Sequence, residues 1–210
     1  MLLKKESFED GCSIGIWEVE ESVSELSEIL ENADIYNEKL SVFSNEKRKK
    51  EWIAVRLLVN LLCGENKIIC YNENGKPFLK DNSFQISISH TKGTVAVIVH
   101  PTKEVGIDVE KISNKIIGLQ HKFLNNIEIQ DIDKQNETFH LLLYWCAKEV
   151  IYKMINQNGV DFSNHLHISA FEPKLQGQFS GKETKSEKQE NFTFEYRIKK
   201  DFILVWSVKQ

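Results

Sequence analysis

The chain has 210 residues, of which 41% are hydrophobic and 28% are charged, a composition typical of a soluble globular protein with a sizeable core. A formal net charge of -4 and an isoelectric point near 5.9 argue against a general nucleic-acid binder, because such proteins meet phosphate backbones with a strong basic excess. Local basic clusters remain compatible with this balance.

The start of the chain, residues 1–6, lacks the continuous apolar segment of a signal peptide, and no later run approaches the length that spans a bilayer. We therefore expect a cytoplasmic protein with neither a membrane nor a nucleic acid as its partner. The cysteines form no C-x-x-C pair, so buried free thiols are expected rather than a zinc site or a disulfide framework. They are Cys12, Cys63, Cys70 and Cys146.

A strand over residues 13–19 and an acidic amphipathic helix over 21–32 are the first predicted elements. Residues 45–62 repeat apolar side chains at intervals of three and four, which predicts a long helix. Its first turns are crowded with basic residues, which oppose the helix macrodipole. They form either a solvated turn or a site for anions, and they are Lys47, Arg48, Lys49 and Lys50.

Turn residues within 71–79, "YNENGKPFL", separate two extended runs. Strands are predicted at 84–90 and 94–100, where they form a hairpin, and at 105–111, "VGIDVEK". Side chains of a strand alternate between its two faces, so Asp108 and Glu110 share one face of this last strand. If that face is open to water, the pair is merely solvated. If it lines a cleft, two like charges so close need a cation between them.

The second half of the chain repeats this order. We predict a long helix over 138–155, a strand over 165–171, and a hairpin of strands at 192–198 and 202–208. Residues 177–191 are polar and charged and predict a mobile hairpin loop. His165 and His167 are better explained by exposed alternation in a strand than by a metal site. The matching order indicates two similar α+β halves with a cleft between them.

Trp145, Glu149 and Lys153 are successive i, i+4 neighbours on the second long helix and form one stripe. A surface ion pair explains Glu149 and Lys153 in most helices. This helix, however, is otherwise mostly apolar. If it crosses the strand that carries Asp108 and Glu110, then Glu149 joins them as a third carboxylate.

Three carboxylates suit a hard cation such as Mg²⁺, or Mn²⁺, which proteins usually share with the phosphates of a substrate. Basic side chains could then meet those phosphates. The candidates are Lys47, Arg48, Arg56, Lys76 and Lys153.

Four short motifs occur in order along the chain: "NGKP" at 74–77, "SISH" at 87–90, "GIDVE" at 106–110 and "WCAKEVIYK" at 145–153. Each motif is weak alone. Together, in this order and spacing, the chain resembles the 4′-phosphopantetheinyl transferases of the surfactin-synthetase-activating (Sfp) type. The resemblance spans roughly residues 45–155, and the last quarter of the chain matches only in its predicted strands.

The resemblance implies an α+β fold of two pseudo-symmetric halves, residues 1–110 and 111–210, with the ligand cleft between them. The implied enzyme is a holo-[acyl-carrier-protein] synthase. It transfers the 4′-phosphopantetheine arm of coenzyme A, its co-substrate, to a serine of an apo acyl, peptidyl or aryl carrier protein and leaves adenosine 3′,5′-bisphosphate. A monomer is expected, because the smaller trimeric carrier-protein synthases resemble one half of the chain.

Residue roles are implied in the same way. The metal would be bound by Asp108, Glu110 and Glu149, with Glu149 also the general base and Lys153 the group that stabilises phosphate charge or protonates the leaving oxygen. Coenzyme A would be contacted by Lys47, Arg56, Lys76, Ser89, His90 and Asp108, with His90 on the 3′-phosphate.

Two positions depart from the commonest family pattern, Thr91 after the histidine and Val150 after the Lys-Glu pair, and neither removes a charge or a ligand. Two alternative functions use the same residues. One is a Mg²⁺-dependent hydrolase of the coenzyme A diphosphate, and the other is a non-catalytic protein that binds coenzyme A or a carrier.

Overall fold

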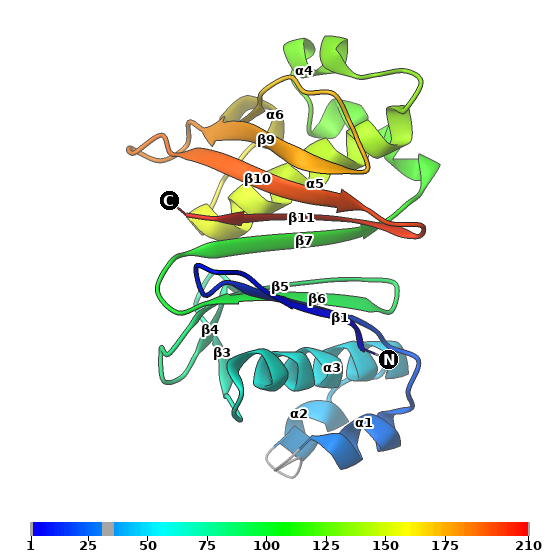
Figure 1. The fold of residues 1–210 in the computed structure, drawn as a ribbon, viewed down its shortest axis with the longest axis vertical. Coiled ribbons are helices and arrows are strands. Elements are labelled where there is room, and N and C mark those ends of the chain that lie inside the picture. The colour runs from blue at the N-terminus through cyan, green and yellow to red at the C-terminus, as the bar shows by residue number, and fades with distance from the viewer. Residues whose placement is uncertain (1, 31–35, 210) are drawn as a thin grey trace.

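The computed structural model describes residues 2–30 and 36–209. Two antiparallel sheets lie face to face, with one long helix on the outer side of each (Figure 1). The first sheet has the strand order β1-β2-β6-β5 and the second the order β7-β11-β10-β9-β8. The protein is therefore an α+β fold of two packed halves, as the sequence predicts.

The first half contains two short helices and the long helix α3 beside its strands. Its elements are β1 (Leu2–Ser7), β2 (Ser13–Glu18), α1 (Val23–Ile29), α2 (Asn37–Ser41), α3 (Glu46–Cys63), β3 (Ile69–Tyr71), β4 (Pro77–Leu79), β5 (Gln85–Thr91) and β6 (Thr94–His100). β3 and β4 form a separate two-stranded hairpin. Asn45 begins α3, because its side-chain Oδ1 accepts from the backbone N–H groups of Lys47 and Arg48.

The second half follows with the strand that carries the predicted acids. Its elements are β7 (Val105–Lys111), the 3₁₀ helix η2 (Asn114–Lys122), α4 (Asn126–Asp131), α5 (Glu137–Ile155), α6 (Phe162–His165), β8 (Leu166–Ile168), β9 (Gln176–Glu183), β10 (Asn191–Ile198) and β11 (Phe202–Val208). The helices at its far end lie opposite α1 and α2 along the long axis of the molecule (Figure 1).

The two halves share one internal arrangement. In the first sheet β2 pairs with β6, which pairs with β5, and in the second sheet β7 pairs with β11, which pairs with β10. The long helices pack correspondingly, α3 on β2 and β6 and α5 on β7 and β11. By this pairing β7 belongs to the second sheet. The division of the chain between residues 110 and 111 stays a prediction.

Three clusters of buried hydrophobic residues hold the layers together. One lies between α3 and the first sheet, and another between α5 and the second sheet. The third joins the two sheets through inward-facing residues of β2, β6, β7 and β11, among them Ile16, Ile98, Ile107 and Leu204. Because strand side chains alternate, the opposite face of β7, with Asp108 and Glu110, is turned toward α5.

Three sequence predictions in the second half are wrong. The loop predicted over residues 177–191 is confined to 184–190, because β9 occupies 176–183 between β8 and β10, with its buried and exposed side chains alternating. The strand predicted over 165–171 is limited to β8, at 166–168. His165 belongs to α6, so His165 and His167 do not lie on one strand face.

The predicted helix over 21–32 is shorter, at Val23–Ile29, and its positions 31 and 32 lie outside the described residues. The four cysteines are free thiols, with Cys12 and Cys146 buried and Cys63 and Cys70 half-buried. In the described part of the chain, no helix is both long and apolar enough to cross a membrane.

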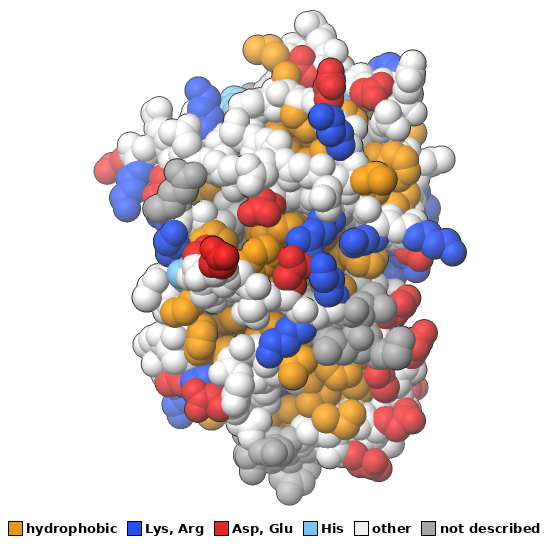
Figure 2. Space-filling model, in the orientation of Figure 1, with side chains coloured by type: hydrophobic (Ala, Val, Ile, Leu, Met, Phe, Trp, Pro, Cys, Tyr) orange, Lys and Arg blue, Asp and Glu red, His pale blue; other side chains and the backbone are white. Residues whose placement is uncertain are grey.

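Charge is unevenly distributed over the surface. Figure 2 shows Lys and Arg side chains gathered near the middle of one face, where the two sheets meet. One surface hollow lies at the junction of the two sheets. It is lined by Lys4, Lys111, Lys199 and Lys200, together with Glu18 and Asp201. The net charge of -4 thus coexists with a local basic cluster.

Candidate active site

The predicted acids and the predicted helix stripe meet where α5 crosses β7. Gly106 allows this close approach, because a Cβ atom at that position would lie 2.8 Å from side-chain atoms of both Val150 and Met154. With α5 so near, the side chains of Asp108 and Glu110 meet the stripe that carries Glu149 and Lys153. The sequence prediction that the helix crosses the strand is confirmed.

Asp108 is almost fully buried, with 4% of its surface exposed. Its Oδ1 accepts from Lys153 Nζ at 2.7 Å and from Ser89 Oγ at 2.8 Å. Lys153 Nζ also donates to the backbone oxygen of Ile107 at 2.9 Å. Asp108 Oδ2 is buried and has no hydrogen-bond partner within the described residues. The hydrogen bonds and the ion pair of this carboxylate are therefore gathered on Oδ1.

Glu110 is half-buried and held at both oxygens. Trp145 Nε1 donates to its Oε1 at 3.3 Å, and Thr91 Oγ1 donates to its Oε2 at 3.2 Å. Burial raises the pKa of Glu110 above its ordinary value, and the nearby charge of Asp108 raises it further, against the lowering effect of both hydrogen bonds.

Glu149 is half-buried on α5, one turn from Lys153. Burial raises the pKa of Glu149 from 4.5 to about 7, and the charges of Asp108 and Glu110 add to this effect while Lys153 opposes it. A carboxyl group with this pKa can either hold or accept a proton near neutral pH, as general acid–base catalysis requires.

The donor set fits a hard divalent cation. Three carboxylates from two elements lie near one another, so that the charge of Asp108 raises the pKa of both Glu110 and Glu149, and a buried oxygen of Asp108 lacks a partner among the described residues. Within the described residues no three His, Cys, Asp or Glu side chains already surround one point closely enough to hold an ion. Lys153 Nζ supplies the positive charge beside Asp108 instead.

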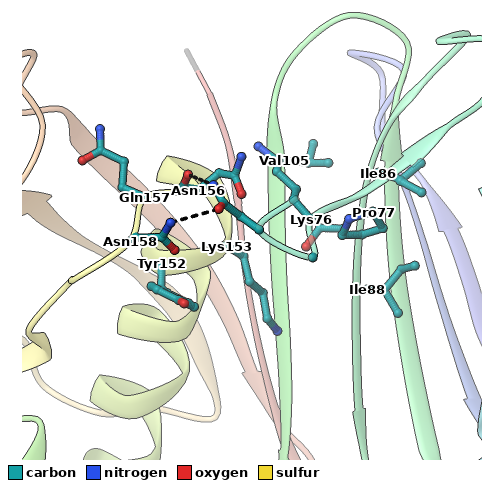
Figure 3. A pocket seen from close by; sticks show the side chains of 13 residues that line it. Lys76, Pro77, Ile86, Ile88, Val105, Tyr152, Lys153, Asn156, Gln157 and Asn158 are labelled. Carbon is teal, nitrogen blue, oxygen red and sulfur yellow. Dashed lines mark hydrogen bonds between the residues drawn. The ribbon is translucent and has the colours of Figure 1, made fainter. Parts of the chain in front are cut away.

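A pocket opens at the junction of the two halves, and Lys153, the ion-pair partner of Asp108, is among its lining residues. Figure 3 shows Tyr152 and Lys153 of α5 on one wall and Pro77, Ile86 and Ile88 on the opposite wall. Asn74 and Asn158 join across the pocket, since Asn158 Nδ2 donates to Asn74 Oδ1 at 3.1 Å (Figure 3).

Lys76 also lines this pocket, but its ammonium is engaged. Nζ donates to the backbone oxygen of Met154 at 3.1 Å and lies 3.4 Å from Glu104 Oε1. The first contact satisfies one of the last carbonyl groups of α5, which have no partner within the helix. Lys76 therefore fastens the hairpin of the first half to the helix that carries Glu149.

A second pocket adjoins the first and shares Gly75, Pro77 and Ile88 with it. We call the two together the junction groove. The second pocket is lined by the cationic residues Arg48 and Arg56, by His90 and by the acid Glu51. It lies on the first half, between α3 and the end of β5.

Arg56 is 3% exposed, and its guanidinium lies 3.0 Å from the centre of the Trp52 ring. Its Nη1 donates to the backbone oxygen of Trp52 at 2.9 Å. Burial lowers the pKa of Arg56 to about 10, so the side chain stays cationic at neutral pH. This fixed charge faces the groove.

Arg48, His90 and Glu51 form one connected group. Arg48 Nη1 hydrogen-bonds His90 Nε2, and Glu51 Oε2 lies 3.8 Å from Arg48 Nη1 and 3.6 Å from His90 Nδ1. Burial, and next the charge of Arg48, lowers the pKa of His90 below its ordinary value. The imidazole is therefore mainly neutral at pH 7.

The predicted site residues thus divide into three groups. Asp108, Glu110, Glu149 and Lys153 come together at the α5–β7 crossing. Arg56, Lys76 and His90 line the junction groove, and Ser89 lies beneath it as a partner of Asp108. Lys47 is exposed, 3.9 Å from Glu51 Oε1, and lines neither pocket of the groove.

Sequence reasoning missed Glu51, which accepts from the backbone N–H of Gly93 at 3.2 Å and so ties α3 to the β5–β6 turn. It also assigned no role to Ser87, whose Oγ accepts from the backbone N–H of Ile107 at 3.2 Å. For Glu51, the available signal in the sequence was its i, i+3 spacing from Arg48 on the predicted helix. No local signal marks Ser87, because its partner comes from the other sheet.

Two comparisons with known proteins, one with family models and one with curated proteins, give matches of the same description. Residues 104–206 match the model of the family described as the 4′-phosphopantetheinyl transferase superfamily. Two curated relatives, from Escherichia coli O157:H7 and from E. coli strain K12, are both named 4′-phosphopantetheinyl transferase AcpT. Each is 26% identical over 145 residues, which cover 61% of this chain and 72% of the relative. The α5–β7 crossing lies within the matched residues.

Proposed function

We propose that this chain, a member of the 4′-phosphopantetheinyl transferase superfamily over residues 104–206, transfers the 4′-phosphopantetheine arm of coenzyme A to a serine of an apo carrier protein. One observation carries the proposal. Within the matched residues, α5 and β7 bring three carboxylates and Lys153 together, and Lys153 also lines a groove that holds two arginines and a histidine.

Coenzyme A is an anion with a diphosphate and a 3′-phosphate, and the junction groove offers matching cations. Arg48 and Arg56 are suited to phosphate oxygens because a guanidinium presents several N–H donors in a fixed plane. We assign the 3′-phosphate to the pocket that holds these two residues and His90. The diphosphate then belongs nearer to Lys153 and the acids, with Lys76 between the two regions.

The reaction needs one proton acceptor and one group that stabilises the leaving oxygen. The carrier serine Oγ forms a bond with the β-phosphorus, and the bond from that phosphorus to the oxygen bridging the two phosphates breaks. Glu149, with a pKa of about 7, accepts the serine proton directly or through water. Lys153 stabilises or protonates the departing phosphate oxygen, so that adenosine 3′,5′-bisphosphate leaves.

A divalent cation accompanies this chemistry in the family, and we assign it to Asp108, Glu110 and Glu149. When bound there, it would neutralise charge on the diphosphate. The oxygen-only ligand set favours Mg²⁺, with Mn²⁺ as the alternative.

We also propose that the chain is of the Sfp type, that it is a monomer and that it is located in the cytoplasm. The internal repeat of strand order, β2-β6-β5 and β7-β11-β10, supports the first two, because one chain then supplies both walls of the groove. Light scattering coupled to gel filtration measures the oligomeric state, and a dimer or trimer would exclude a monomer.

The decisive experiment is intact-mass analysis of apo carrier proteins after incubation with coenzyme A, Mg²⁺ and this protein. We expect the carrier to gain one phosphopantetheine, and the Glu149→Gln variant to lose this activity by at least about a hundredfold, within the range that general acid–base catalysis contributes. Lys67→Met is the matched control, because Lys67 is a buried, ion-paired lysine that lines neither pocket of the groove.

Two outcomes would contradict transfer to a carrier. If coenzyme A is cleaved while every carrier keeps its mass, the protein is a hydrolase that uses water in place of serine. If coenzyme A stays intact but binds, the protein is a non-catalytic coenzyme A or carrier-binding protein.

A further inference from the structure

The motif "WCAKEVIYK" contains a lysine, Lys148, to which the proposed reaction assigns no role. Its side chain is fully buried, with 0% of its surface exposed. All three ammonium protons can be satisfied. Nζ donates to Glu128 Oε2 at 2.6 Å, to the backbone oxygen of Phe123 at 2.7 Å and to the backbone oxygen of Phe162 at 3.0 Å.

Glu128, the partner of Lys148, is also buried and fully engaged. Its Oε2 accepts from the backbone N–H of Asn125 at 2.9 Å, and its Oε1 accepts from that of Ile168 at 2.9 Å. The Lys148–Glu128 pair thus fastens α5 to the end of η2, to α4, to α6 and to β8. These segments cover the outer end of the second half (Figure 1).

Burial of such a pair is not the most stabilising choice. Removing two charges from water is unfavourable, and well-packed apolar residues often replace a buried pair without loss of stability. Its distinctive effect here is geometric, because one ammonium fixes two backbone carbonyls that lie far apart in the sequence. Those carbonyls belong to Phe123 and Phe162.

The rings of these two phenylalanines contact the same side chain, Trp145. The Phe123 ring meets the indole edge-on, with the centroids 5.4 Å apart, and the Phe162 ring lies with its centroid 5.6 Å away at a tilt of 33°. Trp145 Nε1 in turn donates to Glu110 Oε1. A continuous chain of contacts therefore runs from Lys148 through two rings and an indole to the carboxylate.

We infer that Lys148 is a positioning residue: by holding the backbones of Phe123 and Phe162, it fixes the Trp145 indole against Glu110. This inference rests on the proposed function for the role of Glu110, but the contacts themselves are independent of it. Lys148 lines neither pocket of the junction groove, and among the described residues its ammonium bonds Glu128 and two backbone oxygens rather than Asp108, Glu110 or Glu149. Its effect on catalysis therefore passes through the orientation of Glu110.

The test is an NMR measurement combined with kinetics. The chain has four tryptophans, so the ¹H–¹⁵N spectrum shows few indole signals, and Trp145→Phe identifies the one from Trp145. In Lys148→Met we expect this signal to shift or broaden while those of Trp17, Trp52 and Trp206 stay in place. The apparent affinity for Mg²⁺ should fall about 10-fold, as when an outer-shell partner of a metal ligand is removed.

A second variant separates positioning from unfolding. Lys148→Met leaves Glu128 as a lone buried charge and can destabilise the fold, whereas Lys148→Met/Glu128→Gln removes both charges and leaves the same two carbonyls without their donor. We expect the double variant to fold and to show the same change at Trp145. Lys67→Met, the matched buried lysine of the first half, should leave the Trp145 signal and the Mg²⁺ affinity unchanged.

The inference is overturned if the folded double variant keeps the Trp145 signal at its wild-type position. It is equally overturned if that signal moves while the Mg²⁺ affinity and the transfer rate stay at wild-type values. The indole signal can be read whether or not the protein transfers phosphopantetheine. A failure of the proposed function is therefore distinguishable from a failure of this inference.

Discussion

The Glu149 carboxylate destabilises the folded chain at alkaline pH, because it is half-buried beside two other acids. Its pKa is raised from 4.5 to about 7 by folding. Below pH 4.5 the carboxyl is protonated in both states and has no effect. As the pH rises from 4.5 to 7, the folded state retains a proton that the unfolded state has lost, so stability falls. The full cost is present above pH 7.

We therefore predict that Glu149→Gln stabilises the metal-free protein at pH 8 by on the order of 2 kcal/mol, and by little at pH 5. Urea unfolding of both proteins in the presence of a chelator measures the difference. An equal difference in unfolding free energy at the two pH values would show that the carboxyl is not perturbed by its neighbours.

Adjacent basic residues on the first turn of α3 should differ in their effect on coenzyme A. Arg48 lines the junction groove and hydrogen-bonds His90, whereas Lys47 is exposed beyond it. We predict that Arg48→Met raises the KM for coenzyme A about tenfold, equivalent to roughly 1.4 kcal/mol, and that Lys47→Met raises it less. Steady-state kinetics with saturating carrier measures both. If Lys47→Met raises the KM for coenzyme A more than Arg48→Met does, the 3′-phosphate binds nearer the protein surface than we propose.

Single residues were predictable where a local rule sets their direction. Strand alternation placed Asp108 and Glu110 on one face, and helical spacing placed Glu149 and Lys153 on one stripe. The ion pair between Lys153 and Asp108 was not predictable, because it depends on how closely α5 approaches β7. The same applies to Glu51 and Ser87, whose partners lie on other elements.

At the scale of elements, each long helix meets its sheet at a glycine. A Cβ atom at Gly15 of β2 would lie 2.5 Å from Leu58 of α3, and one at Gly106 of β7 would lie 2.8 Å from Val150 of α5. The two contacts occupy equivalent places in the two halves. Only in the second half does the contact set the spacing of the candidate active site.

We predict that Gly15→Ala and Gly106→Ala each destabilise the fold by about 1–3 kcal/mol, the usual cost of overpacking. Gly106→Ala should in addition lower the transfer rate, because α5 must move away from β7 and carry Glu149 and Lys153 with it. Gly15→Ala is the control for stability alone. Equal transfer rates in the two folded variants would mean that the α5–β7 spacing does not limit catalysis.

Elements with a strong apolar pattern were predicted to within a few residues: α3 and α5 repeat apolar side chains at intervals of three and four, and β6 and β11 are short continuous apolar runs that are buried on both faces. β9 was mistaken for a loop. Its exposed positions carry Gln, Gly, Ser and Lys, and its pairing with β8 and β10 overrides this weak local preference. The short η2, α4 and α6 have too few turns to show a period.

At the scale of the whole molecule, sequence order indicated two similar halves but not how they face each other. The sheets meet through side chains such as Ile16 and Ile107, which read only as ordinary strand positions in the sequence. Polar contacts then fix the junction, since backbone N–H groups of β7 donate to Ser87 and Ser89 of β5. The groove exists only in the assembled pair.

A salt bridge between β1 and β10 also joins the two halves. Arg197 Nη1 and Nη2 donate to the two carboxylate oxygens of Glu6 at 2.5 and 2.8 Å. This contact, together with a smaller contribution from Lys4, lowers the pKa of Glu6 from 4.5 to about 2, despite partial burial. A carboxyl whose pKa is depressed by folding stabilises the protein above its unfolded value, and the contribution is lost as the pH falls from about 4.5 to about 2.

We predict that Arg197→Met lowers the free energy of unfolding at pH 7 by about 1 kcal/mol, a value reduced for the partial exposure of both side chains. The difference from wild type should shrink steadily below pH 4.5, because protonated Glu6 no longer attracts the guanidinium. Urea titrations between pH 7 and pH 3 measure this dependence. Lys4→Met is the matched control, since Lys4 pairs with the same carboxylate within β1 and cannot link the halves. If the Arg197→Met difference does not depend on pH, the contact acts through packing on Trp206 rather than through charge.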